Sequence, residues 1–154
     1  MKMLDCRIFK YVDKAISKNK EVKRVIIDDK VFLIIEKHCG FLLSNCDLFS
    51  YIKIAVLSEK IISEILNKND KNKVINISAK FEDRHIGNVR KLILNNGQNV
   101  YVNNKYYKKF KKFKLYGGDR KISPIKAYDD NDNLVGFFMP FHPDYFEKRY
   151  GETD

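Results

Sequence analysis

Apolar side chains recur at helical spacing in three stretches of the chain. In residues 7–19 they return every three or four positions, which places them on one face of a helix. Ser58 stands at the N-cap position of a second helix over residues 59–69, whose isoleucines also share one face. A third helix is predicted from Asn103 to residue 116, where the glycine pair at residues 117–118 would end it.

Between these helices, β-branched and aromatic residues form short apolar runs that predict strands. Hairpins are expected around polar turns at residues 28–30, 95–97 and 129–133, and Asn-Asn-Gly at 95–97 is the strongest hairpin signal. Residues 41–56 carry two further strand-like pieces separated by a polar turn, and residues 74–80 alternate as a strand with one buried face. The strands are therefore short and joined mainly by tight turns.

This order of elements predicts an α+β fold in which antiparallel hairpins carry about three amphipathic helices. A length of 154 residues suits one domain with its own core. We expect residues 1–141 to form that domain and residues 142–154 to form a C-terminal tail that packs only in part. No apolar run approaches the ~20 residues of a membrane span, and residues 1–10 lack the apolar stretch of a secretory signal. The expectation is a soluble, cytoplasmic protein without a membrane partner.

Charge is the most informative property of the sequence. Thirty Lys and Arg face twenty Asp and Glu, and the formal net charge of +10 favours polyanions such as nucleic acid as partners. The chain has 24 lysines but only six arginines, and it is also rich in Ile and Asn. Lys, Ile and Asn have AT-rich codons, so an AT-rich genome would by itself produce part of the lysine excess. Such a composition and the small size would suit a protein of a phage or another mobile element. The positions of the lysines therefore matter more than their number.

Lysine is concentrated in the predicted third helix. Residues 105–114 hold six lysines, while Tyr106, Phe110 and Phe113 are spaced to form an apolar seam against a sheet. Lysines three or four positions apart on a helix repel one another, so this concentration favours an anionic partner. The helix would follow the phosphates of a nucleic acid without reading its bases. The predicted nucleic-acid-binding residues are Lys105, Lys108, Lys109, Lys111 and Lys112 here, and Lys10, Lys14 and Lys18 in the first helix. The alternative is a solvated face in a lysine-rich proteome.

Two blocks of the sequence resemble the bacterial DNA-polymerase sliding clamps, the β-clamp family. Residues 123–140 begin with Ser-Pro, pass through an acidic turn and close on Met-Pro, as the final hairpin of that family does. Upstream, residues 102–113 are similar to the opening of the family's lysine-rich helix. Near the other end, residues 41–54 are similar to a clamp segment in which an apolar strand runs into Thr-Asp-Leu, with Cys46 in place of the threonine.

This resemblance implies a clamp-like fold whose helices lie on outer sheets and line a positively charged hole around DNA. Clamp subunits contain two or three such domains and this chain has room for one, so a ring would require a homo-oligomer. In the family the Met-Pro segment borders a pocket for short partner peptides, which carries over to Met139, Pro140 and Phe141. The chain departs from the family at His142, which stands where a terminal arginine is usual.

One group of residues has the composition of a catalytic site. Glu82, Asp83 and His85 combine carboxylates that hold Mg²⁺ with a base, as a nuclease requires. The Asp- and Asn-rich run at residues 129–133 predicts a hairpin turn rather than a calcium loop, because the Gly and the distal Glu of that loop are missing. The sequence has no nucleotide-binding or zinc-protease motif, and its three cysteines match no metal-ligand spacing. A non-enzyme without cofactor or metal is the favoured interpretation.

The sequence thus favours a non-enzymatic accessory protein that binds nucleic acid in DNA replication, recombination or repair. The alternative is a phage-type inhibitor or adaptor, comparable to anti-CRISPR proteins, that binds an acidic protein or nucleoprotein surface of a host defence or replication complex. A third interpretation is an Mg²⁺-dependent nuclease built around Glu82, Asp83 and His85. Salt-sensitive binding to plain DNA, binding only to a protein, and Mg²⁺-dependent cleavage would distinguish the three in turn.

Overall fold

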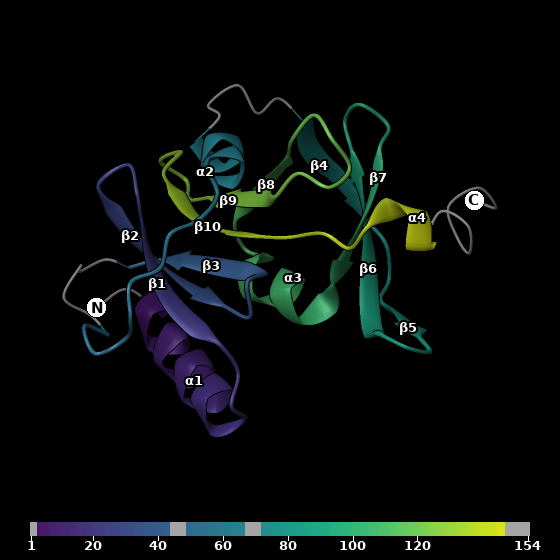
Figure 1. The fold of residues 1–154 in the computed structure, drawn as a ribbon. Coiled ribbons are helices and arrows are strands. Elements are labelled where there is room, and N and C mark those ends of the chain that lie inside the picture. Colours follow the sequence, from purple (N-terminus) through teal and green to yellow (C-terminus); the bar gives the residue numbers. More distant parts are fainter. Residues whose placement is uncertain (1–2, 44–48, 67–71, 147–154) are drawn as a thin grey trace. The chain divides into compact units, whose positions relative to one another are not determined.

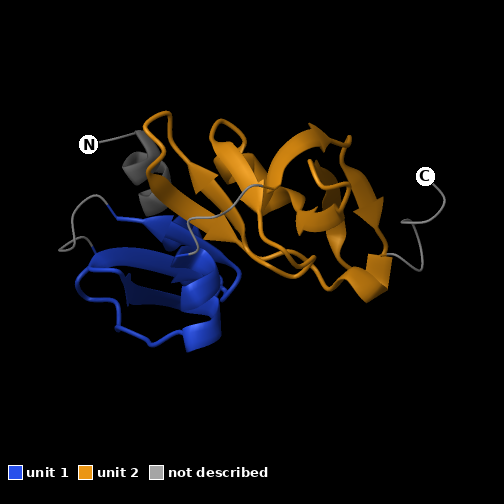
Figure 2. Ribbon diagram, turned by 90° about the horizontal axis from the view of Figure 1, so that it is seen from above, with its two compact units in different colours: residues 1–66 blue, residues 67–154 orange. Residues whose placement is uncertain are grey.

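The computed structural model describes residues 3–43, 49–66 and 72–146, with side chains from residue 10 onwards (Figure 1). These residues form ten strands and four helices, and the ladders within each part of the chain are antiparallel, which confirms the α+β class. The chain divides into two compact units, residues 1–66 and residues 67–154 (Figure 2). A single domain over residues 1–141 stays a prediction. No helix in the described ranges is long and apolar enough to span a membrane.

The first unit is built on a three-stranded antiparallel meander. Its strands are β1 (Val22–Ile27), β2 (Lys30–Ile35) and β3 (Cys39–Leu42). Asp28 and Asp29 join β1 to β2, and the three residues 36–38 join β2 to β3. Asp28, Asp29, Glu36 and Lys37 all have left-handed φ angles, between 51° and 66°. Two successive left-handed residues make a type I′ turn, whose twist matches that of antiparallel strands. The hairpin predicted around residues 28–30 is confirmed.

Helix α1 (Met3–Ser17) packs on this unit through the apolar stripe that the sequence predicts. Val12 and Ala15 are buried, and the ring of Tyr11 stacks on Phe41 of β3 with 5.9 Å between centroids. The helix begins and ends earlier than its predicted bounds. Its predicted apolar face is confirmed at Val12 and Ala15, whereas Ile16 on the same face is 47% exposed.

Helix α2 (Glu59–Leu66) begins where the sequence predicts. The Oγ of Ser58 accepts a hydrogen bond from the backbone N–H of Ile61 at 3.3 Å, which satisfies one of the free donors of the first turn. Glu59 adds a carboxylate to that turn, where the helix dipole favours negative charge. Ile65 is buried, so the isoleucine-rich face is the packed one.

The second strand-like piece expected in this unit is not a strand. Residues 49–57 form only an isolated parallel bridge, between Ile54 and Arg24 of β1. The side chain of Arg24 donates hydrogen bonds to the carbonyl oxygens of Ile52, at 2.8 Å, and Ser50, at 3.1 Å. An arginine therefore satisfies carbonyls that a neighbouring strand would otherwise bind. The polar turn predicted just before this segment lies outside the described residues.

The second unit contains the other seven strands and two helices. The strands are β4 (Asn72–Ile77), β5 (Phe81–Asp83), β6 (Gly87–Leu94), β7 (Asn99–Asn103), β8 (Lys114–Gly117), β9 (Ile125–Tyr128) and β10 (Leu134–Phe138). The helices are α3 (Asn104–Phe110) and α4 (Pro143–Phe146). The strand order is β10-β9-β8-β4-β6, and β5 and β7 also pair with β6. The hairpins predicted around residues 95–97 and 129–133 are confirmed as the β6–β7 and β9–β10 turns.

Strand β4 differs from the half-buried strand that its alternation predicts. Ile75 and Ile77 are 62% and 38% exposed. The register with β6 shifts between Val74 and Asn76, and the Asn76 side chain accepts a hydrogen bond from the N–H of Ile77 at 2.8 Å. Strand β4 pairs with β8 only at Asn72 and Lys73, so the side of residues 74–77 that faces away from β6 has no strand partner among the described residues. A bulge and a side-chain cap of this kind hinder the addition of another strand there.

Strands β6 and β7 have helix α3 on one face and an aromatic cluster on the other. Side chains alternate along β7, so Val102 and Tyr101 point to opposite faces, and both are buried. Tyr101 stacks on Phe146 of α4 with 4.8 Å between centroids. On the other face, Phe110 of α3 stacks on Phe138 of β10 with 5.7 Å between centroids. The expected C-terminal tail is therefore packed at α4, and residues 147–154 lie outside the described residues.

The third helix is shorter than the sequence predicts. It ends at Phe110, Lys111 and Lys112 lie in the turn that follows, and β8 begins at Lys114. Placing Lys111 and Lys112 on the helix was therefore wrong. The physical reason is the pairing of β8 with β9 and β4, whose backbone hydrogen bonds a continued helix would forgo.

Candidate nucleic-acid interface

Helix α3 separates buried aromatic residues from lysines. The side chain of Asn103 caps its first turn by accepting a hydrogen bond from the N–H of Lys105 at 3.0 Å. The side chains that face the sheets are buried, namely those of Asn104, Tyr106, Tyr107 and Phe110. Lys105 and Lys108 are exposed, and Lys109 is half-buried. The apolar seam and the basic side predicted for this helix are both present over its seven residues.

A single arginine anchors α3 to the sheet. The Nε of Arg90 donates to Oδ1 of Asn104 at 2.8 Å, and its Nη1 donates to the carbonyl oxygen of Ser78 at 2.8 Å. The guanidinium carbon also lies 5.1 Å from the centroid of the Tyr107 ring. Arg90 thus uses its charge inside the unit. The sequence gives no signal for this role, because the partners of Arg90 lie on other elements and form no motif with it.

The ring of Tyr106 holds two lysines. Its centroid lies 5.0 Å from Nζ of Lys105 and 5.5 Å from Nζ of Lys109. Ammonium groups are attracted to the negative face of an aromatic ring. Tyr106 therefore directs two of the predicted binding residues towards the same region and offsets part of their mutual repulsion.

The basic side of α3 continues into the turn that follows. Lys111 and Lys112 are exposed, and residues 103–118 contain no Asp or Glu. Within the described ranges, Lys108, Lys111 and Lys112 have no carboxylate at ion-pair distance. We call these five lysines the α3 basic surface: Lys105, Lys108, Lys109, Lys111 and Lys112.

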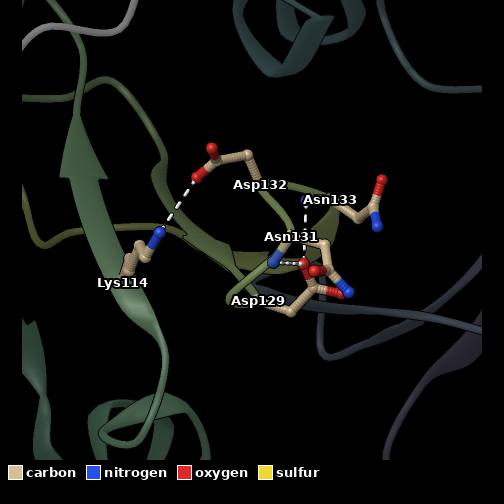
Figure 3. Close-up of polar contacts among 5 residues, drawn as sticks. All are labelled: Lys114, Asp129, Asn131, Asp132 and Asn133. Atoms are coloured by element: carbon tan, nitrogen blue, oxygen red, sulfur yellow. Dashed lines mark hydrogen bonds and ion pairs between the residues drawn. The ribbon is translucent and has the colours of Figure 1, made fainter.

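The sixth lysine of this stretch, Lys114, forms an ion pair with a carboxylate. The Nζ of Lys114 donates a hydrogen bond to Oδ1 of Asp132 in the β9–β10 turn at 3.1 Å (Figure 3). This hydrogen bond raises the pKa of Lys114 above its ordinary value, helped by the charges of Asp132 and Asp130. Lys114 is therefore distinct from the α3 basic surface.

The turn that carries Asp132 is held by its own first carboxylate. Oδ1 of Asp129 accepts hydrogen bonds from the N–H groups of Asn131 and Asn133, both at 2.9 Å (Figure 3). Asp132 has a left-handed φ of 59°, which Asp tolerates better than most residues. The acidic run is the hairpin turn that the sequence predicts, and no group of three potential metal ligands occurs among the described residues.

The substitution Asp132→Asn should lower the pKa of Lys114 towards its ordinary value. A raised pKa means that the pair stabilises the fold fully below the unfolded-state pKa of lysine. That contribution is lost as the pH rises through the higher folded-state value. NMR titration of the Lys114 side chain measures the change, and Asp130→Asn, which removes only a weaker charge effect, is the control. An unchanged Lys114 titration in Asp132→Asn would contradict the assignment.

The predicted binding residues of the first helix lie on the other unit. Lys10 and Lys14 are exposed and one helical turn apart on α1, and Lys18 is exposed just after the helix ends at Ser17. This arrangement forms a second basic stripe. It belongs to residues 1–66, whereas the α3 basic surface belongs to residues 67–154.

The residues that the clamp resemblance implies for partner binding pack against their own unit. Met139, Pro140 and Phe141 are all half-buried. The N–H of Phe141 donates to the carbonyl oxygen of Tyr101 at 2.8 Å, and its ring lies 5.4 Å from that of Phe146 between centroids. Phe141 therefore extends the aromatic cluster under α4.

Asp83 has a structural role in the turn between β5 and β6. It is only 2% exposed, and its Oδ1 accepts hydrogen bonds from the N–H groups of His85, at 2.9 Å, and Ile86, at 3.1 Å. The hydroxyl of Tyr145 donates to the same oxygen at 3.1 Å. Glu82 and His85 are exposed. The grouping that suggested a nuclease is thus a hairpin whose central carboxylate is occupied by protein donors.

No known protein family, curated protein or solved structure matches this chain. The functional argument therefore rests on the geometry of its own side chains. Among the described residues, the densest cationic group is the α3 basic surface, positioned by the Asn103 cap, the Arg90 anchor and the Tyr106 ring.

Proposed function

We propose that the α3 basic surface binds the phosphate groups of nucleic acid without reading the base sequence. In this proposal the protein is a non-enzymatic accessory factor in DNA replication, recombination or repair. The observation that carries it is the exposure of Lys108, Lys111 and Lys112 in a stretch without carboxylates, with no ion-pair partner in the described ranges. The clamp resemblance adds the further proposal that several copies surround DNA.

Electrostatics supports phosphate as the ligand. Exposed lysines without counter-charges repel one another, and on binding nucleic acid they displace the cations condensed around its phosphates. Phosphate contacts from lysine carry no sequence information, because the phosphate group is the same at every nucleotide. The side chains here that would suit base edges are already used: Asn103 caps α3, and Asn104 binds Arg90. These points support sequence-independent binding.

A triple substitution of Lys108, Lys111 and Lys112 to Gln tests the proposal. Each lost phosphate contact lowers the slope of log affinity against log salt by ~0.9, so three should lower it by about 2.7 and reduce affinity about tenfold or more at low salt. Fluorescence anisotropy with a labelled DNA duplex over a salt series measures both quantities. The matched control replaces three exposed lysines of the first unit, Lys30, Lys53 and Lys60, by Gln.

Different outcomes separate the competing interpretations. If the control loses as much affinity as the test variant, net charge rather than the α3 basic surface governs binding. If the test variant binds like wild type, the Lys10, Lys14 and Lys18 stripe of α1 becomes the candidate, and its Gln variants should then lose affinity. If wild type binds neither DNA nor RNA at low salt, the proposal is wrong and an acidic protein partner replaces it.

A further inference from the structure

The segment beside β1 presents an unpaired backbone edge in the first unit. The N–H of Arg24 donates to the carbonyl oxygen of Lys53 at 3.1 Å, and the N–H of Ala55 donates to the carbonyl oxygen of Arg24 at 2.8 Å. Backbone groups of successive residues in an extended chain point to opposite sides. Those of Ile54 therefore point away from β1. Within the described ranges, Ile54 and Val56 make no backbone hydrogen bond.

The side chains of this edge are apolar and exposed. Ile54 is 51% exposed and Val56 is 93% exposed, and Tyr51 nearby is 72% exposed. β-branched residues of this kind favour strand pairing. An apolar edge with open N–H and C=O groups is a template for another strand.

The second unit shows how an edge of this chain is blocked. Strand β4 also exposes isoleucines, Ile75 and Ile77, but the Asn76 side chain occupies the N–H of Ile77 and a bulge shifts the register with β6. Among the described residues, no comparable side chain occupies the N–H of Ile54 or Val56. Two edges of similar composition thus differ in whether their backbone is available.

We propose that residues 53–57 dock an extended acidic peptide of a partner protein by β-strand addition. Only another extended polypeptide offers N–H and C=O groups in the alternation that this edge requires. Lys53 is the only charged residue in residues 49–58, and the whole chain carries +10, so charge complementarity selects an acidic partner over a second copy of the same basic chain. Apolar side chains of the peptide would cover Ile54 and Val56.

The test uses a labelled, end-blocked nonapeptide of alternating Val and Glu. Anisotropy should show saturable binding, and NMR hydrogen exchange at the Ile54 and Val56 amides should slow about tenfold when the peptide is bound. The variant Val56→Asp should weaken binding about tenfold or more, because it places a carboxylate in the apolar contact and repels the acidic peptide. The control Ile75→Asp introduces the same change on β4 and should alter affinity by less than about twofold.

A second control separates strand pairing from simple charge attraction. A nonapeptide of the same sequence with N-methylated central amides keeps every charge but cannot pair, so it should bind about tenfold more weakly. Equal binding of the two peptides, no effect of Val56→Asp, or no binding at millimolar peptide would overturn the proposal. If sedimentation shows self-association that protects the same two amides, the occupant is a second copy and the acidic-peptide proposal is wrong. The inference concerns the first unit and is independent of the function proposed for the α3 basic surface.

Discussion

Replacing Phe110 by alanine should lower the free energy of unfolding by about 3–5 kcal/mol, the range for truncating a buried phenylalanine. Phe110 is fully buried, and its ring stacks nearly parallel on Phe138, at 8° between planes, with a tilted contact to Phe113. It is also the last residue of α3. Its removal leaves a cavity and loosens the helix that carries the basic surface.

Urea unfolding followed by circular dichroism measures this loss as a lower midpoint at unchanged slope. The control is Phe113→Ala, which removes a half-buried ring just after the helix and should cost clearly less. At salt concentrations where Phe110→Ala stays folded, weaker nucleic-acid binding would link the packing of α3 to its lysines. A loss below about 1 kcal/mol would show that Phe110 is not the packing anchor described here.

Helix α3 depends on the burial of Phe110 because the helix is unstable by itself. Its lysines repel one another, and a helix of seven residues is too short to be stable alone. Burial of aromatic residues, the Arg90 anchor and the contacts of Tyr106 with two lysines oppose that repulsion. Added salt should therefore stabilise wild type slightly, because it screens the lysines.

Local chemistry explains why the hairpins were predictable. The turns at residues 28–30, 95–97 and 129–133 contain Asp, Asn or Gly, which accept left-handed or side-chain-capped backbone within a few residues. The Ser58 cap is local in the same sense. Such signals need no knowledge of distant parts of the chain, and the structure agrees with each of them.

The predictions from sequence are wrong where pairing between distant segments of the chain determines the local structure. The spacing of Tyr106, Phe110 and Phe113 suits a long helix, but β8 pairs with β9 and β4 and ends the helix at Phe110. Gly117, which resembled a helix terminator, is needed because a Cβ there would lie 2.6 Å from Cδ1 of Leu94. Neither contact has a signature in the neighbouring sequence.

The candidate site shows the same division. The lysines were visible in the sequence, and their spacing placed Lys105 and Lys108 correctly on the exposed side of a helix. The hydrogen bond between Arg90 and Asn104 could not be predicted, because these residues are separated by 14 positions. The ion pair of Lys114 likewise depends on Asp132, 18 positions away. Sequence composition reveals which charges exist, whereas the fold determines which of them are available.

Asp83 is the residue whose role changed most between sequence and structure. In the sequence its neighbours Glu82 and His85 suggest metal-assisted cleavage, which would require an accessible carboxylate. In the fold, Asp83 is buried and accepts hydrogen bonds from two backbone amides of its own turn and from Tyr145, 62 positions later. It thereby joins the β5–β6 turn to α4.

Replacing Asp83 by alanine should therefore lower the free energy of unfolding by about 2–4 kcal/mol, because it leaves buried donors without an acceptor. The substitution Asp83→Asn keeps an oxygen at the same position and should retain most of the stability, whereas Tyr145→Phe removes one hydrogen bond and should cost about 1 kcal/mol. Urea unfolding of the three variants gives the comparison.

A nuclease carboxylate would behave in the opposite way: Asp83→Ala would be tolerated by the fold, and both Asp83 variants would abolish Mg²⁺-dependent cleavage. Stability lost in Asp83→Ala and kept in Asp83→Asn, with no cleavage by wild type, would exclude that role.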